Sequence, residues 1–261
     1  MQSESVEIVK RDSVATVWMN RPHAHNAIDA HLIEGLTQAF AELAEEEAIR
    51  VIILAGRGRS FSAGGDLKWM LAASEAGFET NFEDARGLAH LLQSVAMSRK
   101  PTIARVHGPA LGDGVGLAAA CDICIASLSA NFAMPEVRMG LIPATIGPHV
   151  ARAIGPRQAL RYFLTGERLS AARAVEIGLA HEALEVEHLD MRIAKIAESL
   201  VLGGPSALAA TKELVRKLDG RAIDDELIDE TARHVALTRG STEAKEGIGA
   251  FLGKGAPQWL K

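Results

Sequence analysis

A glycine-rich segment in the middle of the chain constrains the fold more than any other feature. Residues Gly108 to Asp122 read Gly-Pro-Ala-Leu-Gly-Asp-Gly-Val-Gly-Leu-Ala-Ala-Ala-Cys-Asp, and they follow an apolar run, Thr102 to Val106, that is typical of a buried strand. The segment passes into the helix-forming run Leu117 to Ala120. A strand that enters a helix through such a corner leaves unpaired backbone N–H groups, and the helix dipole favours negative charge there. The corner is therefore suited to bind a phosphate, or an oxygen that becomes negative during a reaction.

The glycine spacing argues against a nicotinamide or flavin site at this corner. Gly112-Asp113-Gly114-Val115-Gly116 superficially resembles the dinucleotide fingerprint. Its third glycine, however, comes one residue too early for G-x-G-x-x-G, and the corner lies deep in the chain rather than in a first strand-helix unit. A purely structural alternative is that the small residues only let a helix pack closely against a sheet.

Two further segments supply what an acid-base site would need. The stretch Gly58 to Leu67, which contains Phe-Ser-Ala-Gly-Gly-Asp, follows the apolar run Val51 to Ala55 and repeats the pattern of a strand entering a turn of small residues. Two such corners can each direct one backbone N–H at a common oxygen, which is how an oxyanion hole is built. Glu136 follows a short strand among apolar neighbours, and burial there would raise its pKa.

Short motifs also occur in a fixed order along the chain. They are Asn20-Arg-Pro22 with Asn26-Ala27, Phe61-Ser-Ala-Gly-Gly-Asp-Leu67, Gly108-Pro-Ala-Leu-Gly112 with Cys121-Asp-Ile123, Phe132 with Pro135-Glu136, Gly140-Leu-Ile-Pro143, and Leu164-Thr-Gly-Glu167 with Ala171-Ala172. In this order and spacing they resemble the crotonase superfamily, also called the enoyl-CoA hydratase/isomerase family. The resemblance extends from about Val6 to the C-terminus.

The resemblance implies an α/β fold, a crotonase-type spiral of repeated ββα units followed by a helical region. Strand and helix patterns alternate up to Ala183 and only helical patterns follow, which is consistent with this fold. Val6 to Lys10 and Val14 to Met19 alternate like paired strands, and helices are expected at about 149–154 and 157–164. Asp29 is expected to cap a helix with one apolar face, formed by Leu32, Ile33, Leu36, Phe40 and Leu43. We expect a catalytic core over residues 1–200 and a helical region over 201–261 that packs on neighbouring subunits, giving a homotrimer or a dimer of trimers. Trp69 to Phe82 has little periodicity, and we expect a mobile connection that shapes the acyl pocket and leads into a helix from about Glu83 to Ser98.

The resemblance assigns the oxyanion hole to the backbone N–H groups of Ala63 and Asp113. In the family these two donors polarise the carbonyl of a CoA thioester, and each well-placed donor stabilises the transition state by about 3 to 4 kcal/mol. Glycine is usual at the position of Asp113, and a carboxylate beside an enolate would repel it. We therefore expect the Asp113 side chain to turn away and cap the following helix, with a catalytic carboxylate as the alternative.

Glu136 matches the second of the two glutamates that hold the attacking water in ordinary enoyl-CoA hydratases. Gly116 stands where the first glutamate would be. With one glutamate, either Glu136 acts alone as base and acid, or the substrate or a water network supplies the missing function.

The resemblance also suggests how an acyl-CoA substrate is bound. Residues expected to contact it are His23, Ala24, Ala63, Gly64, Gly65 and Asp66, with His23 in the loop that lines the cleft for the CoA adenine and phosphates. Arg138 would share a face with Glu136 if the chain is extended there, and is a candidate partner for a second substrate carboxylate; a surface or intersubunit ion pair is the alternative. Lys254 resembles a C-terminal lysine that approaches the nucleotide of a neighbouring subunit.

Coenzyme A is part of the substrate, so no separate cofactor is implied. His23 and His25 lack the acidic or cysteine neighbours of a metal site, so no metal is expected.

Three functions remain open at this point. The segment from Pro135 to Ile146, together with Gly116, looks most like bacterial hydratases of branched glutaconyl-CoA esters, which act on 3-methylglutaconyl-CoA in leucine catabolism or isohexenylglutaconyl-CoA in acyclic terpene catabolism. An enoyl-CoA isomerase that uses the same glutamate is a second possibility. The third is a non-catalytic acyl-CoA-binding subunit, suggested by Gly116 and Asp113.

Composition narrows the partners and the compartment. The net charge is −5 and no long basic run occurs, which argues against nucleic acid or an anionic membrane as the main partner. Cys121 and Cys124 are spaced as C-x-x-C, but they lie where a helix leads into an apolar run, so we expect buried spectator thiols. The first residues lack the basic and apolar regions of a signal peptide, and we expect a cytoplasmic protein.

Overall fold

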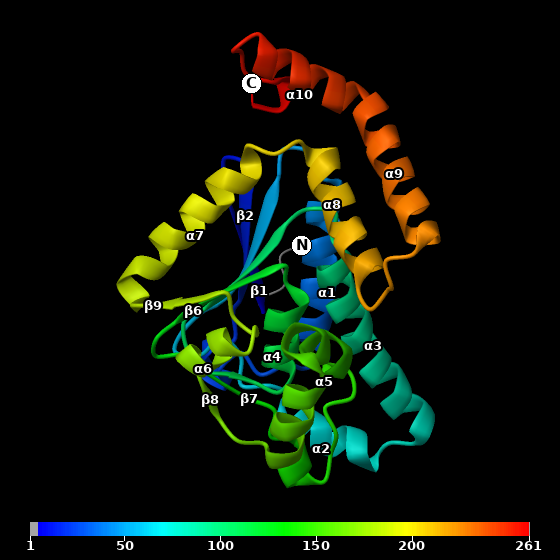
Figure 1. Ribbon diagram of the computed structural model, residues 1–261. Helices are drawn as coiled ribbons and strands as arrows, with labels where there is room; N and C mark the ends of the chain where they lie inside the picture. The colour runs from blue at the N-terminus through cyan, green and yellow to red at the C-terminus, as the bar shows by residue number, and fades with distance from the viewer. Residues whose placement is uncertain (1–4, 261) are drawn as a thin grey trace.

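The computed structural model describes residues 5–260. The segment 1–4, on which the expectation about a signal peptide partly rests, lies outside the described residues. The described chain forms an α/β structure with a larger and a smaller sheet and helices on both faces of the larger sheet (Figure 1). The predicted α/β class is confirmed.

The larger sheet has the strand order β1-β2-β3-β4-β6-β9. The first pair is the predicted antiparallel hairpin, and the other strands pair in parallel, with Ile52 opposite Thr102 and Ile103 opposite Ile123. The six strands are β1 (Val6–Arg11), β2 (Val14–Met19), β3 (Val51–Gly56), β4 (Thr102–Val106), β6 (Ile123–Ser127) and β9 (Glu182–Leu184).

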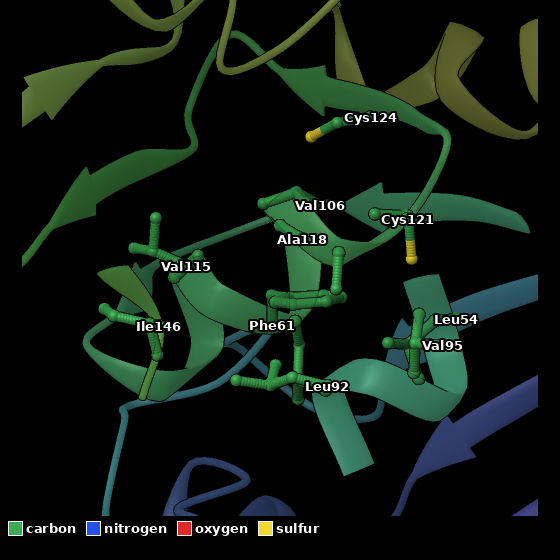
Figure 2. Packing of buried hydrophobic residues seen from close by; sticks show 14 of the residues in the cluster. Leu54, Phe61, Leu92, Val95, Val106, Val115, Ala118, Cys121, Cys124 and Ile146 are labelled. Carbon is green, nitrogen blue, oxygen red and sulfur yellow. The ribbon is translucent and has the colours of Figure 1, made fainter. Parts of the chain in front are cut away.

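Side chains of the larger sheet enter two separate cores. On β3, Val51 and Ile53 pack with α7 (Val186–Val201), whereas Ile52 and Leu54 point to the opposite face. This second core contains α1 (Ala30–Glu45) and the helices that surround the glycine-rich corner (Figure 2). Burial on both faces explains why β3 reads as a continuous apolar run rather than an alternating one.

The helix after Asn26 begins and packs as its sequence predicts. Asp29 is its N-cap, with the carboxylate accepting a hydrogen bond of 2.9 Å from the N–H of Leu32. Its buried face contains the predicted residues Leu32, Ile33, Leu36, Phe40 and Leu43.

The smaller sheet brings the predicted functional segments together. It consists of β5 (Ala110–Leu111), β7 (Asn131–Ala133) and β8 (Leu169–Ser170), with β5 and β7 parallel. α4 (Asp113–Ala120) begins just after β5, and the 3-10 helix η2 (Glu136–Met139) begins just after β7. Because the carboxyl ends of parallel strands meet at one edge, the start of α4 and Glu136 lie side by side.

The expected mobile connection from Trp69 to Phe82 is instead mostly helical. α2 (Leu67–Glu75) follows its N-cap Asp66, and α3 (Phe78–Met97) follows its N-cap Gly77 and includes the predicted helix near Glu83. Most of this stretch is exposed, so its sequence lacks the apolar periodicity from which a core-facing helix can be predicted.

The two cysteines are buried, as predicted. Burial raises the pKa of the Cys121 thiol far above its usual range and that of Cys124 to about 12. Because the thiolate is the reactive form, neither thiol is suited to redox chemistry.

The remaining helices follow the smaller sheet. They are α5 (Gly147–Thr165), α6 (Ala171–Glu176), α8 (Pro205–Leu218), α9 (Asp225–Gly240) and α10 (Thr242–Leu252), with the short η1 (Pro22–Ala24) and η3 (Gln258–Leu260) elsewhere. α5 contains the two predicted helices on either side of a break at Gly155. Among residues 5–260 no single helix is long and apolar enough to cross a membrane; only α7 and α8 taken together, across a bend of 104°, meet that length and composition.

The C-terminal helices are fixed to the core through α8. The Lys212 ammonium lies 2.5 Å from the Asp122 carboxylate and also donates to the carbonyl of Lys100. Beyond α8, α9 and α10 extend along one edge of the molecule (Figure 1) and expose large apolar side chains. Examples are Ile228, Val235, Leu237, Ile248, Phe251 and Leu252.

Candidate active site

A pocket of about 750 Å³ opens where two glycine-rich corners meet η2. The first corner is the segment 108–122, and the second corner is the segment 58–67. A bridge between Ser62 and Ala110 joins the second corner to β5. The predicted site residues that line the pocket are His23, Ala24, Ala63, Gly64, Gly65, Asp66, Asp113 and Glu136. Gly116, Arg138 and Lys254 do not line it.

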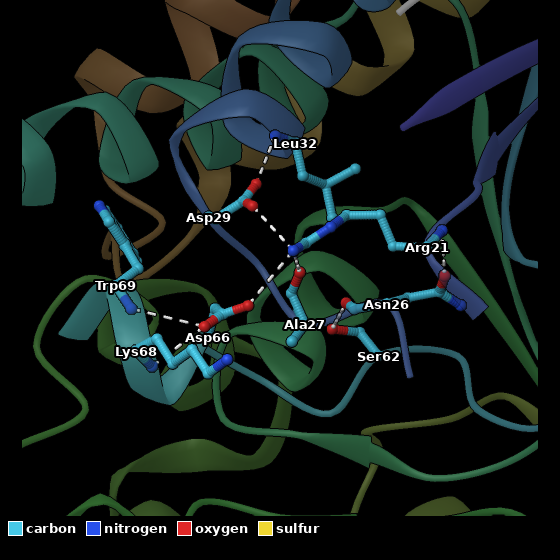
Figure 3. Close-up of polar contacts among 9 residues, drawn as sticks. All are labelled: Arg21, Asn26, Ala27, Asp29, Leu32, Ser62, Asp66, Lys68 and Trp69. Carbon is cyan, nitrogen blue, oxygen red and sulfur yellow. Dashed lines mark hydrogen bonds and ion pairs between the residues drawn. The ribbon is translucent and has the colours of Figure 1, made fainter. Parts of the chain in front are cut away.

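Arg21 joins the loops on one side of the pocket (Figure 3). Its guanidinium lies 2.9 Å from Asp29 and 3.3 Å from Asp66, and it also donates to the carbonyl of Ala27. Asp66 in turn caps α2 by accepting from the N–H of Lys68 at 3.0 Å. The carboxylate of Asp66 is thus committed to positioning the loop, although the residue forms part of the pocket wall as predicted.

Asn26 fixes the second corner from inside the protein. It is fully buried, and its amide nitrogen donates to the carbonyls of Arg57, Ser60 and Phe61 at 2.9, 2.9 and 3.2 Å. Its amide oxygen accepts from the backbone N–H of Arg21 at 2.9 Å. One side chain therefore satisfies four backbone groups from two loops.

The backbone amides of the second corner require a correction to the predicted oxyanion hole. The N–H of Ala63 donates to the carbonyl of His25 at 3.0 Å, so it is already committed. Gly64 and Asp66 pair with Ile28, through the carbonyl of Gly64 and the N–H of Asp66. Because successive N–H groups of an extended chain point to opposite sides, the N–H of Gly65 points away from this pairing, and it has no partner among residues 5–260.

The second predicted donor, the N–H of Asp113, stands at the first turn of α4. That N–H likewise has no partner in the described part of the chain, as expected for the first residue of a helix. Gly112, just before it, has φ +47 and ψ −117, a conformation that suits glycine. Gly65 and Asp113 are therefore the pair of donors that the fold presents to the pocket.

Glu136 is the buried acid of the pocket. Its relative exposure is 9%, and its Oε2 atom has no hydrogen-bond partner among the described residues. Burial, with a contribution from the nearby Asp113 charge, raises the pKa of Glu136 to about 7. A carboxyl group with such a pKa can both accept and donate a proton near neutral pH.

Asp113 does not cap α4, contrary to the expectation. Gly112 is the N-cap and makes no side-chain capping bond, and Asp113 is already the first helical residue. The carboxyl of Asp113 faces the pocket instead: a Cβ placed on Gly65 would lie 3.2 Å from its Oδ2. Burial raises the pKa of Asp113 to about 6.

Gly116 lies behind the pocket wall rather than in it. A Cβ at this position would lie 2.3 Å from Cγ2 of Ile146 and 2.8 Å from its Cβ. Ile146 is fully buried and packs against α4 (Figure 2). The space that a longer side chain would need is therefore filled with hydrocarbon, and Gly116 takes no direct part in the chemistry.

Arg138 was expected to share a face with Glu136, and this expectation is wrong. The chain forms a 3-10 helix here rather than a strand, so residues two apart point in different directions. Arg138 is exposed and donates to the carbonyl of Thr165 at 3.3 Å.

Some pocket residues were missed from the sequence. Lys68 is exposed at the pocket and its ammonium has no ion-pair partner in the described structure. Met70, on the same helix, would lie 2.7 Å from a Cβ on Gly65 and forms apolar wall. The signal for both was the Asp66 capping position, because a helix that begins there turns its first residues toward the corner.

Comparison with known proteins identifies the family. Residues 9–261 match the family model for enoyl-CoA hydratase/isomerase. The carnitinyl-CoA dehydratase of Proteus mirabilis is 31% identical to this chain, over 98% of each chain.

Solved structures agree closely with this fold. A crystal structure of an enoyl-CoA hydratase from Shewanella pealeana superimposes with a TM-score of 0.96 at 36% identity, covering 99% of this chain and 97% of that one. Pseudomonas aeruginosa AtuE superimposes with a TM-score of 0.93 at 33% identity, covering 99% and 100%. The chain therefore belongs to the enoyl-CoA hydratase/isomerase family and is an enzyme of the hydratase type.

Proposed function

We propose that this enzyme adds water to the conjugated double bond of a 3-branched glutaconyl-CoA thioester, either 3-methylglutaconyl-CoA or isohexenylglutaconyl-CoA. The observation that carries the hydration step is Glu136, a buried acid with a pKa of about 7 beside two backbone N–H groups that have no partner among the described residues. The segment Pro135 to Ile146, with its similarity to hydratases of branched glutaconyl esters, supports the substrate class. On this basis the enzyme serves leucine or acyclic terpene catabolism.

The mechanism starts at the thioester oxygen. The N–H groups of Gly65 and Asp113 bind this oxygen and stabilise the negative charge that develops when water attacks the β-carbon. Glu136 supplies the proton that the α-carbon gains, and the proton that water loses restores the acid. Coenzyme A is carried by the substrate, and no other cofactor is needed for this reaction.

Binding of the rest of the substrate falls to the loops at the pocket mouth. We assign Lys68 to the distal carboxylate of the substrate, since this lysine has no ion-pair partner in the described residues and Arg138 faces elsewhere. His23 and Ala24, on η1, are placed to contact the CoA portion.

The assembly and location of the enzyme are part of the same proposal. The apolar side chains exposed on α9 and α10 support packing of residues 201–261 against neighbouring subunits, in a trimer or a dimer of trimers. Lys254, which is remote from the pocket of its own chain, would then approach the CoA of a neighbour. We propose a cytoplasmic enzyme.

The experiment that tests the substrate class is turnover of three thioesters. Purified protein is mixed with 3-methylglutaconyl-CoA, isohexenylglutaconyl-CoA and crotonyl-CoA, and loss of the enoyl thioester absorbance is followed. We expect kcat/KM to be at least about 10-fold higher for one of the two diacid esters than for crotonyl-CoA, because an ion pair to the second carboxylate contributes more than about 1.4 kcal/mol. A preference for crotonyl-CoA would contradict the substrate class.

An isomerase is the second candidate, because Ile146 fills the place of the first glutamate and leaves Glu136 as the only glutamate at the pocket among the described residues. The reactions differ in oxygen incorporation. A hydratase working in water labelled with oxygen-18 puts the label into its product, whereas an isomerase shifts a β,γ double bond without it.

The correction to the oxyanion hole can be tested at single atoms. Replacing Gly65 by glycolic acid through ester incorporation removes its N–H and weakens the carbonyl of Gly64 as an acceptor for Ile28, and we expect kcat to fall by about 100- to 1000-fold. Lactic acid in place of Ala63 is the matched control. It should lower the free energy of unfolding slightly, because the bond to the carbonyl of His25 is lost, and change kcat by less than about 10-fold. The reverse order of effects would restore Ala63 as the donor.

A further inference from the structure

We propose that the carboxyl group of Asp113 is the second acid-base group of this site, the base that takes a proton from water while Glu136 protonates the α-carbon. The inference rests on the proposed hydration and extends it. It assigns to Asp113 the proton transfer from water for which ordinary enoyl-CoA hydratases have a glutamate at the position of Gly116.

The position of Asp113 on α4 makes this substitution possible. Asp113 and Gly116 are three residues apart in one helix, so their side-chain directions lie on one face, one turn apart. At position 116 that face is covered by Ile146, whereas at position 113 it opens into the pocket. The blocked turn thus has no carboxyl group, and the open turn has one.

The two carboxyl groups share one wall of the pocket. A Cβ on Gly65 would lie 3.2 Å from Oδ2 of Asp113, and a Cβ on Gly112 would lie 3.1 Å from Oε1 of Glu136. Neither carboxyl forms an ion pair with a described residue; Glu136 accepts only from its own backbone N–H, and its Oε2 atom has no partner in the described part of the chain.

The electrostatic surroundings favour one shared proton. The other charged groups that line the pocket are Arg21, Asp66 and Lys68, and the first two are paired with each other. From the elements packed against α4, namely α3, α5, β4 and β5, no charged group shifts the pKa of Asp113, which burial alone raises to about 6. Burial, with a contribution from the Asp113 charge, raises the pKa of Glu136 to about 7, so the two carboxyl groups titrate as a pair that holds one proton near neutral pH.

The proton balance is complete without another reactant. Asp113 takes one proton from water, the oxygen of that water bonds to the β-carbon, and the π electrons move to the thioester oxygen. Glu136 then gives its proton to the α-carbon as the enolate collapses. The proton left on Asp113 returns to Glu136, directly or through solvent.

This assignment also removes an objection to a carboxylate beside the oxyanion hole. An ionised Asp113 would repel a negative thioester oxygen. As the base, however, Asp113 becomes neutral in the same step in which the oxygen gains its charge. The two negative charges are therefore never fully developed at the same time, and the carboxylate does not oppose formation of the enolate.

The test compares D113N and D113G with the unaltered full-length enzyme on its best thioester. We expect kcat to fall by about 100-fold or more in both variants with KM within about 3-fold, since D113G keeps the backbone N–H and loses only the carboxyl. We also expect the acidic limb of the pH profile of kcat/KM, near pH 6 in the parent enzyme, to disappear. D190N is the matched control; its carboxylate pairs with Arg105 on the surface, away from the pocket, and its activity should be unchanged.

A D113G enzyme as active as the parent would overturn the proposal, and so would D113N with an unchanged acidic limb. A second readout needs no turnover: side-chain carbon-13 NMR of labelled glutamate, with the Glu136 signal identified by its loss in E136Q. The Glu136 titration midpoint should fall in D113N, and an unshifted midpoint would contradict the pair. If the parent enzyme hydrates none of the thioesters, the proposed function fails, while this titration still decides whether the two carboxyls are coupled.

Discussion

Replacing Glu136 by glutamine lowers kcat by at least about 1000-fold while binding of the CoA thioester persists, because the amide cannot exchange a proton at neutral pH. The substitution keeps the size of the side chain, and only the Oε1 and Oε2 chemistry changes. Steady-state turnover of the preferred thioester, together with calorimetric titration of a saturated acyl-CoA, measures the two effects separately. Turnover within about 10-fold of the parent enzyme would remove Glu136 from the mechanism.

The matched control for this substitution is E167Q. Glu167 is an exposed carboxylate paired with Arg161 at 2.7 Å and lies outside the pocket. Its replacement should leave kcat unchanged. A loss in both variants would point to a general effect of removing charge rather than to Glu136.

The same E136Q variant should be more stable than the parent enzyme in alkaline buffer. The pKa of Glu136 is raised from 4.5 to about 7 in the folded protein, so the folded state holds the proton more firmly than the unfolded chain. As pH rises from 4.5 through about 7, the parent enzyme therefore loses free energy of unfolding. Allowing for solvent screening in an open pocket, we expect about 1 to 2 kcal/mol in favour of E136Q above pH 8, measured by urea unfolding, and only a small part of this gain at pH 5.

Replacing Asn26 by alanine should lower the free energy of unfolding by about 3 to 5 kcal/mol. The substitution leaves the buried carbonyls of Arg57, Ser60 and Phe61 and the N–H of Arg21 without their shared partner. Because the amide joins the two loops that carry Arg21 and Gly65, turnover should fall as well. Urea unfolding followed by circular dichroism gives the first quantity, and steady-state kinetics the second.

Gln38→Ala provides the comparison for Asn26. Gln38 also offers a side-chain amide, but it lies on the exposed surface of α1, where it donates only to Glu42 at 2.8 Å. Its replacement by alanine should lower the free energy of unfolding by less than about 0.5 kcal/mol. If N26A proves as mild as this control, the loops are held by other contacts.

The helices and strands that depend on local sequence pattern were predicted correctly. The helix capped by Asp29, the paired strands at the N-terminus and the buried strand before Gly108 follow from capping and from apolar periodicity. The exposed helix α2 has no such periodicity, and only its Asp66 cap could have revealed it.

Errors at the site arose where the outcome depends on contacts distant in sequence. Whether Ala63 or Gly65 presents its amide is decided by pairing with residues 25–28, which no motif within the corner contains. Arg138 was misplaced because Glu136 begins a 3-10 helix instead of continuing β7. The direction of Asp113 depends on which of the first residues of α4 acts as the cap, and a one-residue shift turned it from a capping group into a pocket group.

The packing of Ile146 over Gly116 also bears on how such a site can change over generations. A glutamate introduced at position 116 would place its Cβ 2.3 Å from Cγ2 of Ile146, so we expect this single substitution to lower stability. Shortening Ile146 alone would leave a hole in the core. We therefore expect a glutamate at position 116 to be tolerated only in a protein in which Ile146 is shortened as well.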